Sequence, residues 1–319
     1  MVKRVLVLAG GGGHTGYAYA LAQALHGKAE LAFLVPKGDS LSARRLEGFG
    51  EVDYVTKSRE PKTPLHVFIP RLFKAFIQSF RKVTRRFDVV VSTGSSLCVP
   101  PALVAWMKGI PIVNIESSVR FVTTSKTARI LQPLAAITAL QWEEQRKFLK
   151  KGVVVGPIIP EPEVKPWNGG YILVTGGTYG HKQLFDMLAE STLGNVVLQT
   201  GPVDPRPYVR KHPEWKVFTV TEQFHEMLAG AALVICHVGE TLFEAVKYGK
   251  PIIIVPNPEW TRTATVEDAK CLAEKINALV VEDITLRNLL EAMGKAREPP
   301  GLLDGAGTLT QLILTLNRL

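Results

Sequence analysis

Cysteines are few in this chain and long apolar runs are absent, and each shortage excludes a class of protein. The 319 residues contain three cysteines, Cys98, Cys236 and Cys271, whose spacing fits neither a zinc cluster nor a disulfide framework. We therefore expect buried, reduced thiols and a cytoplasmic location. Since no apolar run reaches the roughly 18 residues of a spanning helix and the chain begins with a strand, we expect neither a membrane span nor a signal peptide.

Common motifs for metal and phosphate binding are also missing. The chain has no Asp-x-Asp sequence and its seven histidines are scattered, which predicts no metal site and no bound cofactor. No Lys-Ser or Lys-Thr pair follows the first glycine run, although such a pair completes a P-loop.

Positive charge and apolar residues are plentiful. Lysine and arginine number 38 against 29 acidic residues, so the net charge is +9. This charge indicates an anionic partner: nucleic acid, anionic lipid or a phosphorylated substrate. A basic, solvated surface without a specific partner is the alternative. Apolar content of 46% with 21 prolines and 27 glycines is typical of a folded α/β protein.

The most informative stretch is residues 5–16, VLVLAGGGGHTG. A short apolar run closed by glycines predicts a buried parallel strand, a tight turn and a following helix. Backbone N–H groups and the helix dipole then favour an anion, at a loop that contains Gly11, Gly12, Gly13 and Thr15. A structural turn without a ligand is the alternative, but four glycines exceed what such a turn needs.

The same pattern recurs in the second half of the chain. Residues 171–181, YILVTGGTYGH, again combine a strand, glycines and a histidine. Residues 232–240 also resemble 88–96, and residues 247–256 resemble 107–116. We therefore predict two doubly wound α/β halves in tandem.

The boundary between these halves is set by prolines. We predict an N-terminal domain over residues 1–160, a proline-rich linker over 161–169 and a C-terminal domain over 170–319. The apolar face of the last helix, expected over 306–319, could pack back on the first domain.

A dinucleotide site is a weaker interpretation of the first loop. Gly11, Gly13 and Gly16 match the G-x-G-x-x-G fingerprint. That fingerprint requires an acidic ribose ligand at the end of the second strand. Here the strand ends at Lys37 and the nearest acid, Asp39, comes late.

A second group of polar residues follows the apolar strand that ends at Cys236. Ligands of open α/β sheets bind at the carboxyl edge, so Glu244, one turn into the next helix, is placed to accept two ribose hydroxyls. A solvated helix carboxylate is the alternative. The residues of this group are His237, Gly239, Glu240, Thr241 and Glu244.

His14 and Glu116 are the candidates for chemistry in the first half. His14 closes the glycine loop, where it can bind a diphosphate or act as a base. Glu116 ends a strand and could face a cleft between the halves. His181 repeats the position of His14 with less support.

Residues 65–86 show apolar residues at helical spacing with cations between them. A helix that covers the sheet and an interfacial membrane helix both show this pattern, and we weigh them equally. The residues assigned to a membrane contact are Phe68, Arg71, Phe73, Lys74, Phe76, Arg81 and Lys82.

Taken together, these motifs resemble glycosyltransferase family 28, whose members have the GT-B fold. The first half is similar to the membrane-recruiting subunit of the eukaryotic transferase that adds the second N-acetylglucosamine to the dolichol-linked precursor. The second half is similar to its donor-binding subunit. The bacterial transferase that completes the lipid-linked peptidoglycan precursor is a more distant relative. The matching segments are GGGGHTG at 10–16, IES at 115–117, QWEE at 141–144, VTGGT at 174–178 and the run from ICHVGE to PIIIVPN at 235–257.

The resemblance implies two Rossmann-like domains that face each other across a cleft. It implies an inverting, metal-independent transfer of N-acetylglucosamine from UDP-N-acetylglucosamine to a polyprenyl- or dolichyl-diphosphate-linked sugar. The β-1,4 product would belong to lipid-linked oligosaccharide synthesis for N-glycosylation. Such an enzyme would be peripheral at the cytoplasmic membrane face and would bind no nucleic acid.

The resemblance also implies residue roles. Glu244 would hold the ribose, and His14 or Glu116 would be the base, with Glu116 otherwise a positioning residue. The donor-binding residues would be Gly176, Gly177, Thr178, His237, Gly239, Glu240, Thr241 and Glu244.

Two departures from the family pattern leave alternatives open. The usual His-Gln pair before the last donor-site helix is replaced by Asp268 and Ala269, so the identity of the hexosamine stays open. The spanning helix of the membrane-recruiting subunit is also missing, which makes residues 65–86 the expected membrane contact.

Another UDP-sugar enzyme of this fold, such as an epimerase or a transferase to a different lipid, is the first rival function. A non-enzymatic lipid-binding module ranks lower.

Overall fold

The computed structural model describes residues 2–59, 63–260 and 264–317, and the side chain of Thr178 lies outside the described part. The chain forms two compact units. The first consists of Met1–Pro160 together with Leu303–Leu319, and the second consists of Glu161–Leu302.

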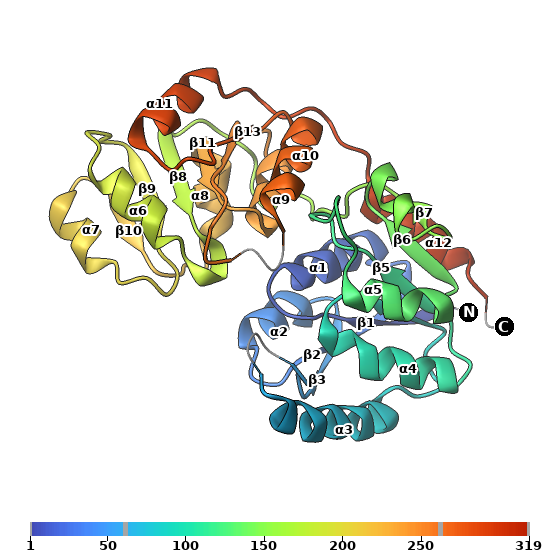
Figure 1. The fold of residues 1–319 in the computed structure, drawn as a ribbon. Coiled ribbons are helices and arrows are strands. Elements are labelled where there is room, and N and C mark those ends of the chain that lie inside the picture. Colours follow the sequence, from blue (N-terminus) through green and yellow to red (C-terminus); the bar gives the residue numbers. More distant parts are fainter. Residues whose placement is uncertain (1, 60–62, 261–263, 318–319) are drawn as a thin grey trace. The chain divides into compact units, whose positions relative to one another are not determined.

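The first unit is built on a seven-stranded parallel sheet (Figure 1). Its strands are β1 (Lys3–Leu8), β2 (Ala29–Pro36), β3 (Gly50–Val55), β4 (Val89–Ser92), β5 (Ile112–Ile115), β6 (Ile137–Leu140) and β7 (Val153–Val154). Its helices are α1 (Gly13–Leu25), α2 (Ser40–Glu47), α3 (Leu65–Lys82), α4 (Val99–Met107), α5 (Lys126–Leu131) and α12 (Gly305–Thr315), with short 3-10 helices η1 (Ser96–Cys98), η2 (Gln132–Leu134) and η3 (Glu143–Lys147).

The second unit is built on a six-stranded parallel sheet. Its strands are β8 (Tyr171–Thr175), β9 (Val196–Gln199), β10 (Lys216–Phe218), β11 (Ala231–Cys236), β12 (Ile252–Ile254) and β13 (Leu279–Val280). Its helices are α6 (Lys182–Ala189), α7 (Arg206–Lys211), α8 (Phe224–Gly230), α9 (Glu240–Lys247), α10 (Val266–Ile276) and α11 (Leu286–Lys295), with the 3-10 helix η4 (Gly177–Tyr179).

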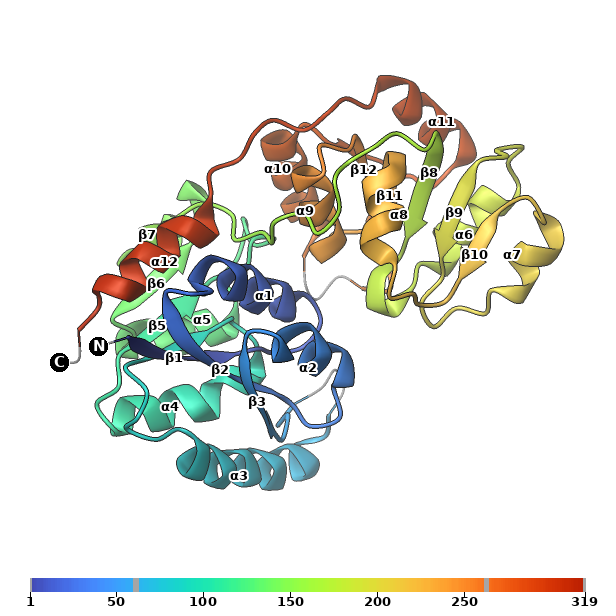
Figure 2. The same ribbon diagram turned by 180° about the vertical axis from the view of Figure 1, so that it is seen from behind.

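The second sheet repeats the strand order of the first six strands of the first sheet. The orders are β3-β2-β1-β4-β5-β6-β7 and β10-β9-β8-β11-β12-β13. In each sheet the second and third strands extend to one side of the first strand, and the later strands extend to its other side. In β1, Val5 and Val7 pack under α1, α2 and α12, whereas Leu6 and Leu8 pack against α3 and α4. Figure 2 shows these helices on the two faces of the sheet. The alternation follows from the two-residue period of a strand, and the prediction of doubly wound halves is confirmed.

The internal repeat corresponds to equivalent elements. β1, β4 and β5 occupy the places of β8, β11 and β12 in the two strand orders. The long first half is explained by the crossover after the third strand, where α3 has 18 residues and the equivalent α8 has seven.

Some elements differ from what the sequence indicates. The run QWEEQRKFL at 141–149 is typical of an α-helix, but Glu143–Lys147 form the 3-10 helix η3, in which the Gln145 side chain accepts from the backbone N–H groups of Gln141 and Trp142. The helices α5, α7 and α11 and the two-residue strand β13 were not expected. Within the described ranges, no helix combines the length and hydrophobicity that crossing a bilayer requires.

The last helix joins the first unit, although the domain boundary expected from the sequence runs to 319. α12 packs against α1, and its residues Leu309 and Ile313 are fully buried in the first core. At the start of α12 the backbone N–H of Gly305 donates to the Pro157 carbonyl at 3.1 Å, and the absence of a side chain at position 305 allows this close approach. A Cβ at position 305 would lie 2.1 Å from the carbonyl oxygen of Gly156, closer than any real contact.

We expect Gly305→Ala to lower the free energy of unfolding by about 1–3 kcal/mol, because the added methyl must push backbone atoms apart. Thermal unfolding measures the loss. Gly301→Ala is the matched control, since a Cβ there meets nothing within 4 Å, and it should change stability by less than about 0.5 kcal/mol. Equal effects of the two substitutions would contradict the close packing of α12.

Candidate active site

The glycine loop lies at the carboxyl edge of the first sheet and leads into α1. Gly11 and Gly12 have φ angles of 81° and 57°, a region that side chains disfavour. Gly12 is the N-cap of α1 and supplies no capping side chain, and the first turn of α1 contains no acidic residue. Gly12 and Gly13 are exposed. The positive end of this helix dipole is therefore open to an anion.

His14 is held in one tautomer by the neighbouring strand. Its Nδ1 lies 2.7 Å from the Thr93 carbonyl oxygen, just beyond β4. A carbonyl only accepts, so Nδ1 carries the proton and Nε2 keeps a lone pair. Burial lowers the pKa of His14 below its ordinary 6.5, with a smaller contribution from the Lys57 charge, while the Thr93 bond opposes the shift. His14 is thus a neutral base near pH 7.

Two other predicted residues of the first unit are engaged inside the protein. Thr15 is 4% exposed, and its hydroxyl lies 2.6 Å from that of Ser42 in α2. Its side chain therefore joins two helices instead of lining the loop, which corrects its assignment to the diphosphate loop. Glu116 is 1% exposed, and both of its carboxylate oxygens accept hydrogen bonds.

The second glycine loop follows β8 and repeats this geometry. Gly177 has a φ of 61°, and its N–H donates to the Thr175 hydroxyl at 3.0 Å. His181 differs from His14, because it is 1% exposed and its Nδ1 accepts from the Leu184 amide as the N-cap of α6. Burial lowers its pKa. His181 therefore serves as a helix cap in this structure.

His237 lies at the carboxyl edge of the second sheet, close to Gly177 in the loop after β8 and to Gly239 in the loop after β11. A Cβ added to Gly177 would lie 3.4 Å from its Nε2, and one added to Gly239 would lie 3.7 Å from it. Burial, with the nearby His181 charge, lowers the pKa of His237 to about 4. His237 is therefore uncharged at neutral pH and acts as a hydrogen-bonding group rather than as a cation.

α9 carries the predicted acidic residues. Gly239 is its N-cap in extended conformation, Glu240 and Thr241 start its first turn, and all three are partly buried. Glu244 is 5% exposed and lies near Tyr248, whose hydroxyl pKa is raised by burial with a contribution from the Glu244 charge.

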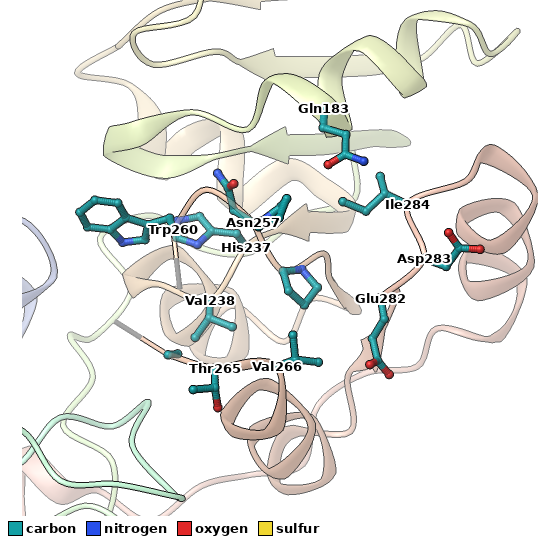
Figure 3. Close-up of a pocket in the computed structure, with 13 residues that line it drawn as sticks. Gln183, His237, Val238, Asn257, Trp260, Thr265, Val266, Glu282, Asp283 and Ile284 are labelled. Atoms are coloured by element: carbon teal, nitrogen blue, oxygen red, sulfur yellow. The ribbon is translucent and has the colours of Figure 1, made fainter. Parts of the chain in front are cut away.

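A pocket of about 290 Å³ opens beside His237 (Figure 3). The Asn257 amide donates to the Gly180 carbonyl at 2.9 Å, and Trp260 stacks on Tyr179 with ring centroids 3.7 Å apart. These contacts tie the loop after β12 to the glycine loop after β8. The lining residues are Gln183, His237, Val238, Pro256, Asn257, Pro258, Trp260, Ala264, Thr265, Val266, Glu282, Asp283 and Ile284.

Most of this pocket was missed from the sequence. Of its lining, only His237 was predicted. Trp260 and Asn257 follow a buried strand, which is the position that marks ligand residues in an open α/β sheet, and that signal could have identified them.

Asp268 and Ala269, the two residues that depart from the family pattern, are not among the residues that line the pocket. Asp268 is fully buried and accepts from the amide and hydroxyl of Thr265 at 2.9 and 3.0 Å. This reciprocal capping box starts α10. Ala269 is also fully buried.

No group of three or more His, Cys, Asp or Glu side chains suited to a metal occurs in the part of the chain that the structure describes.

α3 presents an apolar stripe to solvent. Leu65, Ile69, Phe73, Ile77 and Phe80 are 40–70% exposed at helical spacing. Of the residues assigned to a membrane contact, Phe73, Arg71, Lys74 and Arg81 are exposed.

The other three assigned residues of α3 are placed differently. Phe76 packs against the core and Phe68 is partly buried. Lys82 pairs with Asp53 of β3. Trp106 and Met107 of α4, each more than half exposed, were not predicted and extend the apolar surface next to α3.

Two family profiles together match most of the chain. Residues 5–158 match the profile described as oligosaccharide biosynthesis protein Alg14 like. Residues 171–301 match the glycosyltransferase family 28 C-terminal domain.

Relatives with known names match nearly the whole chain. A UDP-N-acetylglucosamine--N-acetylmuramyl-(pentapeptide) pyrophosphoryl-undecaprenol N-acetylglucosamine transferase from Anaeromyxobacter dehalogenans is 30% identical and covers 94% of this chain and 85% of its own. The transferase of the same name from Salinibacter ruber is 27% identical, with 91% and 86% covered.

Solved structures show the same fold. MurG from Acinetobacter baumannii gives a TM-score of 0.64 at 19% identity, with 98% of this chain and 95% of that chain covered. A UDP-N-acetylglucosamine 2-epimerase from Listeria monocytogenes gives a TM-score of 0.67 at 14% identity, with 98% and 95% covered.

We expect the stability conferred by the neutral state of His237 to decrease as the pH falls from about 6.5 to about 4. The folded protein resists protonation of this group, whereas the unfolded chain binds the proton at the ordinary pKa of 6.5, so acid favours unfolding. In His237→Gln this contribution is absent. The melting temperature should therefore fall less between pH 7 and pH 4.5 in the variant than in the wild type.

The exposed His66 of α3 supplies the control, because His66→Gln should leave the wild-type pH dependence in place. An unchanged pH dependence in His237→Gln would show that His237 is not held neutral by the fold.

Proposed function

The chain belongs to glycosyltransferase family 28, and from that premise we propose that it is an inverting, metal-independent transferase. It moves N-acetylglucosamine from UDP-N-acetylglucosamine to a sugar carried on a polyprenyl diphosphate and forms a β-1,4 bond. The observation that carries this proposal is His14, a neutral base beside an open helix N-terminus at the carboxyl edge of its sheet.

His14 is proposed as the general base. Its Nε2 takes the proton of the acceptor hydroxyl while that oxygen forms a bond to the anomeric carbon. The bond from this carbon to the β-phosphate oxygen breaks, and its electron pair leaves with UDP. The Thr93 carbonyl supports the step, because it holds the Nδ1 proton and stabilises the imidazolium that forms.

The donor is assigned to the second unit. Glu244 accepts the two ribose hydroxyls, and the diphosphate meets the backbone N–H groups at Gly176 and at the start of α9, with Gly177 lining the same site. Gly239, Glu240 and Thr241 belong to this site, and Thr178 remains assigned to it by its position in sequence. Backbone donors and helix dipoles stabilise the departing diphosphate without a metal ion. His237, being uncharged, donates or accepts a hydrogen bond beside them.

The acceptor lipid is proposed to lie at a membrane surface reached through α3. The apolar stripe from Leu65 to Phe80 would enter the acyl region, while Arg71, Lys74 and Arg81 would meet anionic headgroups at the cytoplasmic face. Lys108 steadies the end of this helix, since its Nζ donates to the Phe80 and Val83 carbonyls at 2.6 Å.

Two lipid-linked sugars are candidates for the acceptor. We favour dolichyl- or polyprenyl-diphosphate-N-acetylglucosamine, the substrate of lipid-linked oligosaccharide synthesis for N-glycosylation, because the first unit matches the Alg14-like oligosaccharide biosynthesis profile. The second candidate is the muramyl-pentapeptide lipid, because the full-length relatives are named for it.

Transfer of label from UDP-N-acetylglucosamine to each short-chain lipid diphosphate, with and without EDTA, tests the function. We expect product with the N-acetylglucosamine lipid in both conditions. Product with the muramyl lipid alone would show that the muramyl-pentapeptide lipid, and not the N-acetylglucosamine lipid, is the acceptor. Formation of an epimerised N-acetylhexosamine without any lipid would indicate an epimerase, and loss of transfer only in EDTA would contradict the metal-free mechanism.

Substitutions in the two units should separate chemistry from donor binding. His14→Ala removes the base and should lower kcat by a factor on the order of 10²–10⁴ while UDP binding is kept. Glu244→Ala removes the ribose acceptor and should weaken UDP binding, on the order of tenfold or more. Calorimetric titration with UDP and initial rates give both quantities. An equal loss of UDP binding in both variants would refute the separate roles.

Replacing Phe73 and Ile69 of α3 by serine should reduce cosedimentation with anionic phospholipid vesicles, because two exposed apolar anchors are lost. Val209→Ser with Val220→Ser is the matched control, since both valines are about half exposed on the other unit. Equal vesicle binding by the two double variants would exclude α3 as the membrane contact.

A further inference from the structure

Glu116 closes a loop between β5 and α5 that spans residues 116–125. Its Oε1 accepts from the Ser117 amide at 2.7 Å. Its Oε2 accepts from the Ser125 amide at 3.0 Å and from the Thr124 hydroxyl. Ser125 is the N-cap of α5, so one carboxylate joins the first and last residues of the loop.

The first half of this loop, residues 117–120, is held by side chains of α1 and of η3 with its N-cap. The Ser118 amide donates to the Tyr17 hydroxyl of α1 at 3.0 Å, and the two hydroxyls lie 2.7 Å apart. The Trp142 indole donates to the Ser118 carbonyl at 2.7 Å. The Gln145 amide donates to the carbonyls of Ser117 and Arg120 at 2.7 and 3.0 Å. Backbone groups of Ser117, Ser118 and Arg120 are therefore held by side chains of α1 and of η3 with its N-cap.

The loop meets α1 one turn from His14, because Ser118 bonds to Tyr17, whose ring lies edge to face against that of His14 with the centroids 6.1 Å apart. Arg120 is the one cation among residues 117–125. Its guanidinium donates to the Thr123 hydroxyl at 3.0 Å within the same loop. A guanidinium held in this way is preorganised for the oxygens of a phosphate.

The geometry of Glu116 is unsuited to a base. A general base needs an oxygen lone pair that reaches the acceptor hydroxyl, but Glu116 is 1% exposed. Two of its three donors are backbone N–H groups, which cannot turn away to release the carboxylate. His14 keeps a ring nitrogen available instead.

We propose that Glu116 is a positioning residue that fixes the loop 117–125 so that Arg120 binds the diphosphate of the lipid-linked acceptor beside His14. The inference rests on the proposed transferase function and adds Arg120 of this loop to the residues that bind the acceptor diphosphate. Glu116 acts through Arg120 and contacts no substrate.

Steady-state kinetics with Glu116→Gln distinguish positioning from base catalysis. The amide is isosteric but has one acceptor oxygen in place of two, so one end of the loop is released. We expect the acceptor KM to rise about tenfold, with kcat at saturating acceptor within about threefold of wild type. The acid limb of the pH profile, due to His14, should persist. A fall in kcat on the order of 10²–10⁴ with loss of that limb would overturn the proposal and make Glu116 the base.

Arg120→Gln should reproduce the rise in acceptor KM without changing UDP affinity, because the loop stays closed and only the cation is lost. Glu51→Gln is the matched control, since Glu51 is exposed on β3 and pairs with Arg86. It should behave as wild type. An unchanged acceptor KM in Arg120→Gln would refute the assignment of the diphosphate.

Amide hydrogen exchange tests the loop independently of transfer. Glu116→Gln should speed exchange in residues 117–125, while exchange in β1 and β4 stays as in wild type. If wild type transfers sugar to no acceptor, the transferase proposal fails, whereas the loop measurement still decides the role of Glu116. Unchanged exchange in the loop would refute the positioning role even in an active enzyme.

Discussion

Parallel pairing of the strands is the constraint on which both units depend. Every strand of a parallel sheet ends at the same edge, and the loop that follows each strand begins there. That edge gathers the glycine loop after β1, the Thr93 carbonyl after β4 and the Glu116 loop after β5 in the first unit. In the second unit it gathers the loops after β8, β11 and β12. Residues about 80–100 positions apart in the chain become neighbours through this topology alone.

The three histidines at these edges show how local contacts decide chemistry. His14 and His181 follow equivalent glycine loops, yet the first donates to a carbonyl and keeps Nε2 available, whereas the second caps a helix. His237 makes a third case, because burial keeps it uncharged beside two glycines. His14 and His181 have the same residue type and equivalent sequence positions. Only their hydrogen-bond partners and their burial make the first a candidate base and the second a helix cap.

Large parts of the fold were predictable because they depend on local patterns. Apolar runs closed by glycine gave β1 and β8, and the repeat gave the matching places of β4 with β11. Short helices such as α7 were missed, since prolines mask a six-residue helix. Thr15 was misassigned, because the sequence carries no information on which side of α1 packs against α2. The stack of Tyr179 on Trp260 joins residues 81 positions apart and has no local signal.

The sequence by itself determined the two doubly wound units, the family, and the glycine loops with their histidines, because strand period, turn chemistry and motif order are properties of neighbouring residues. Tertiary structure decided which of those side chains are available. It placed the proton of His14 on Nδ1, because the Thr93 carbonyl, just after β4, lies opposite that atom. It enclosed Glu116 among three donors from its own loop. The glycine run thus became a site in which His14 keeps Nε2 available, since the burial of each polar group depends on elements that are distant in sequence.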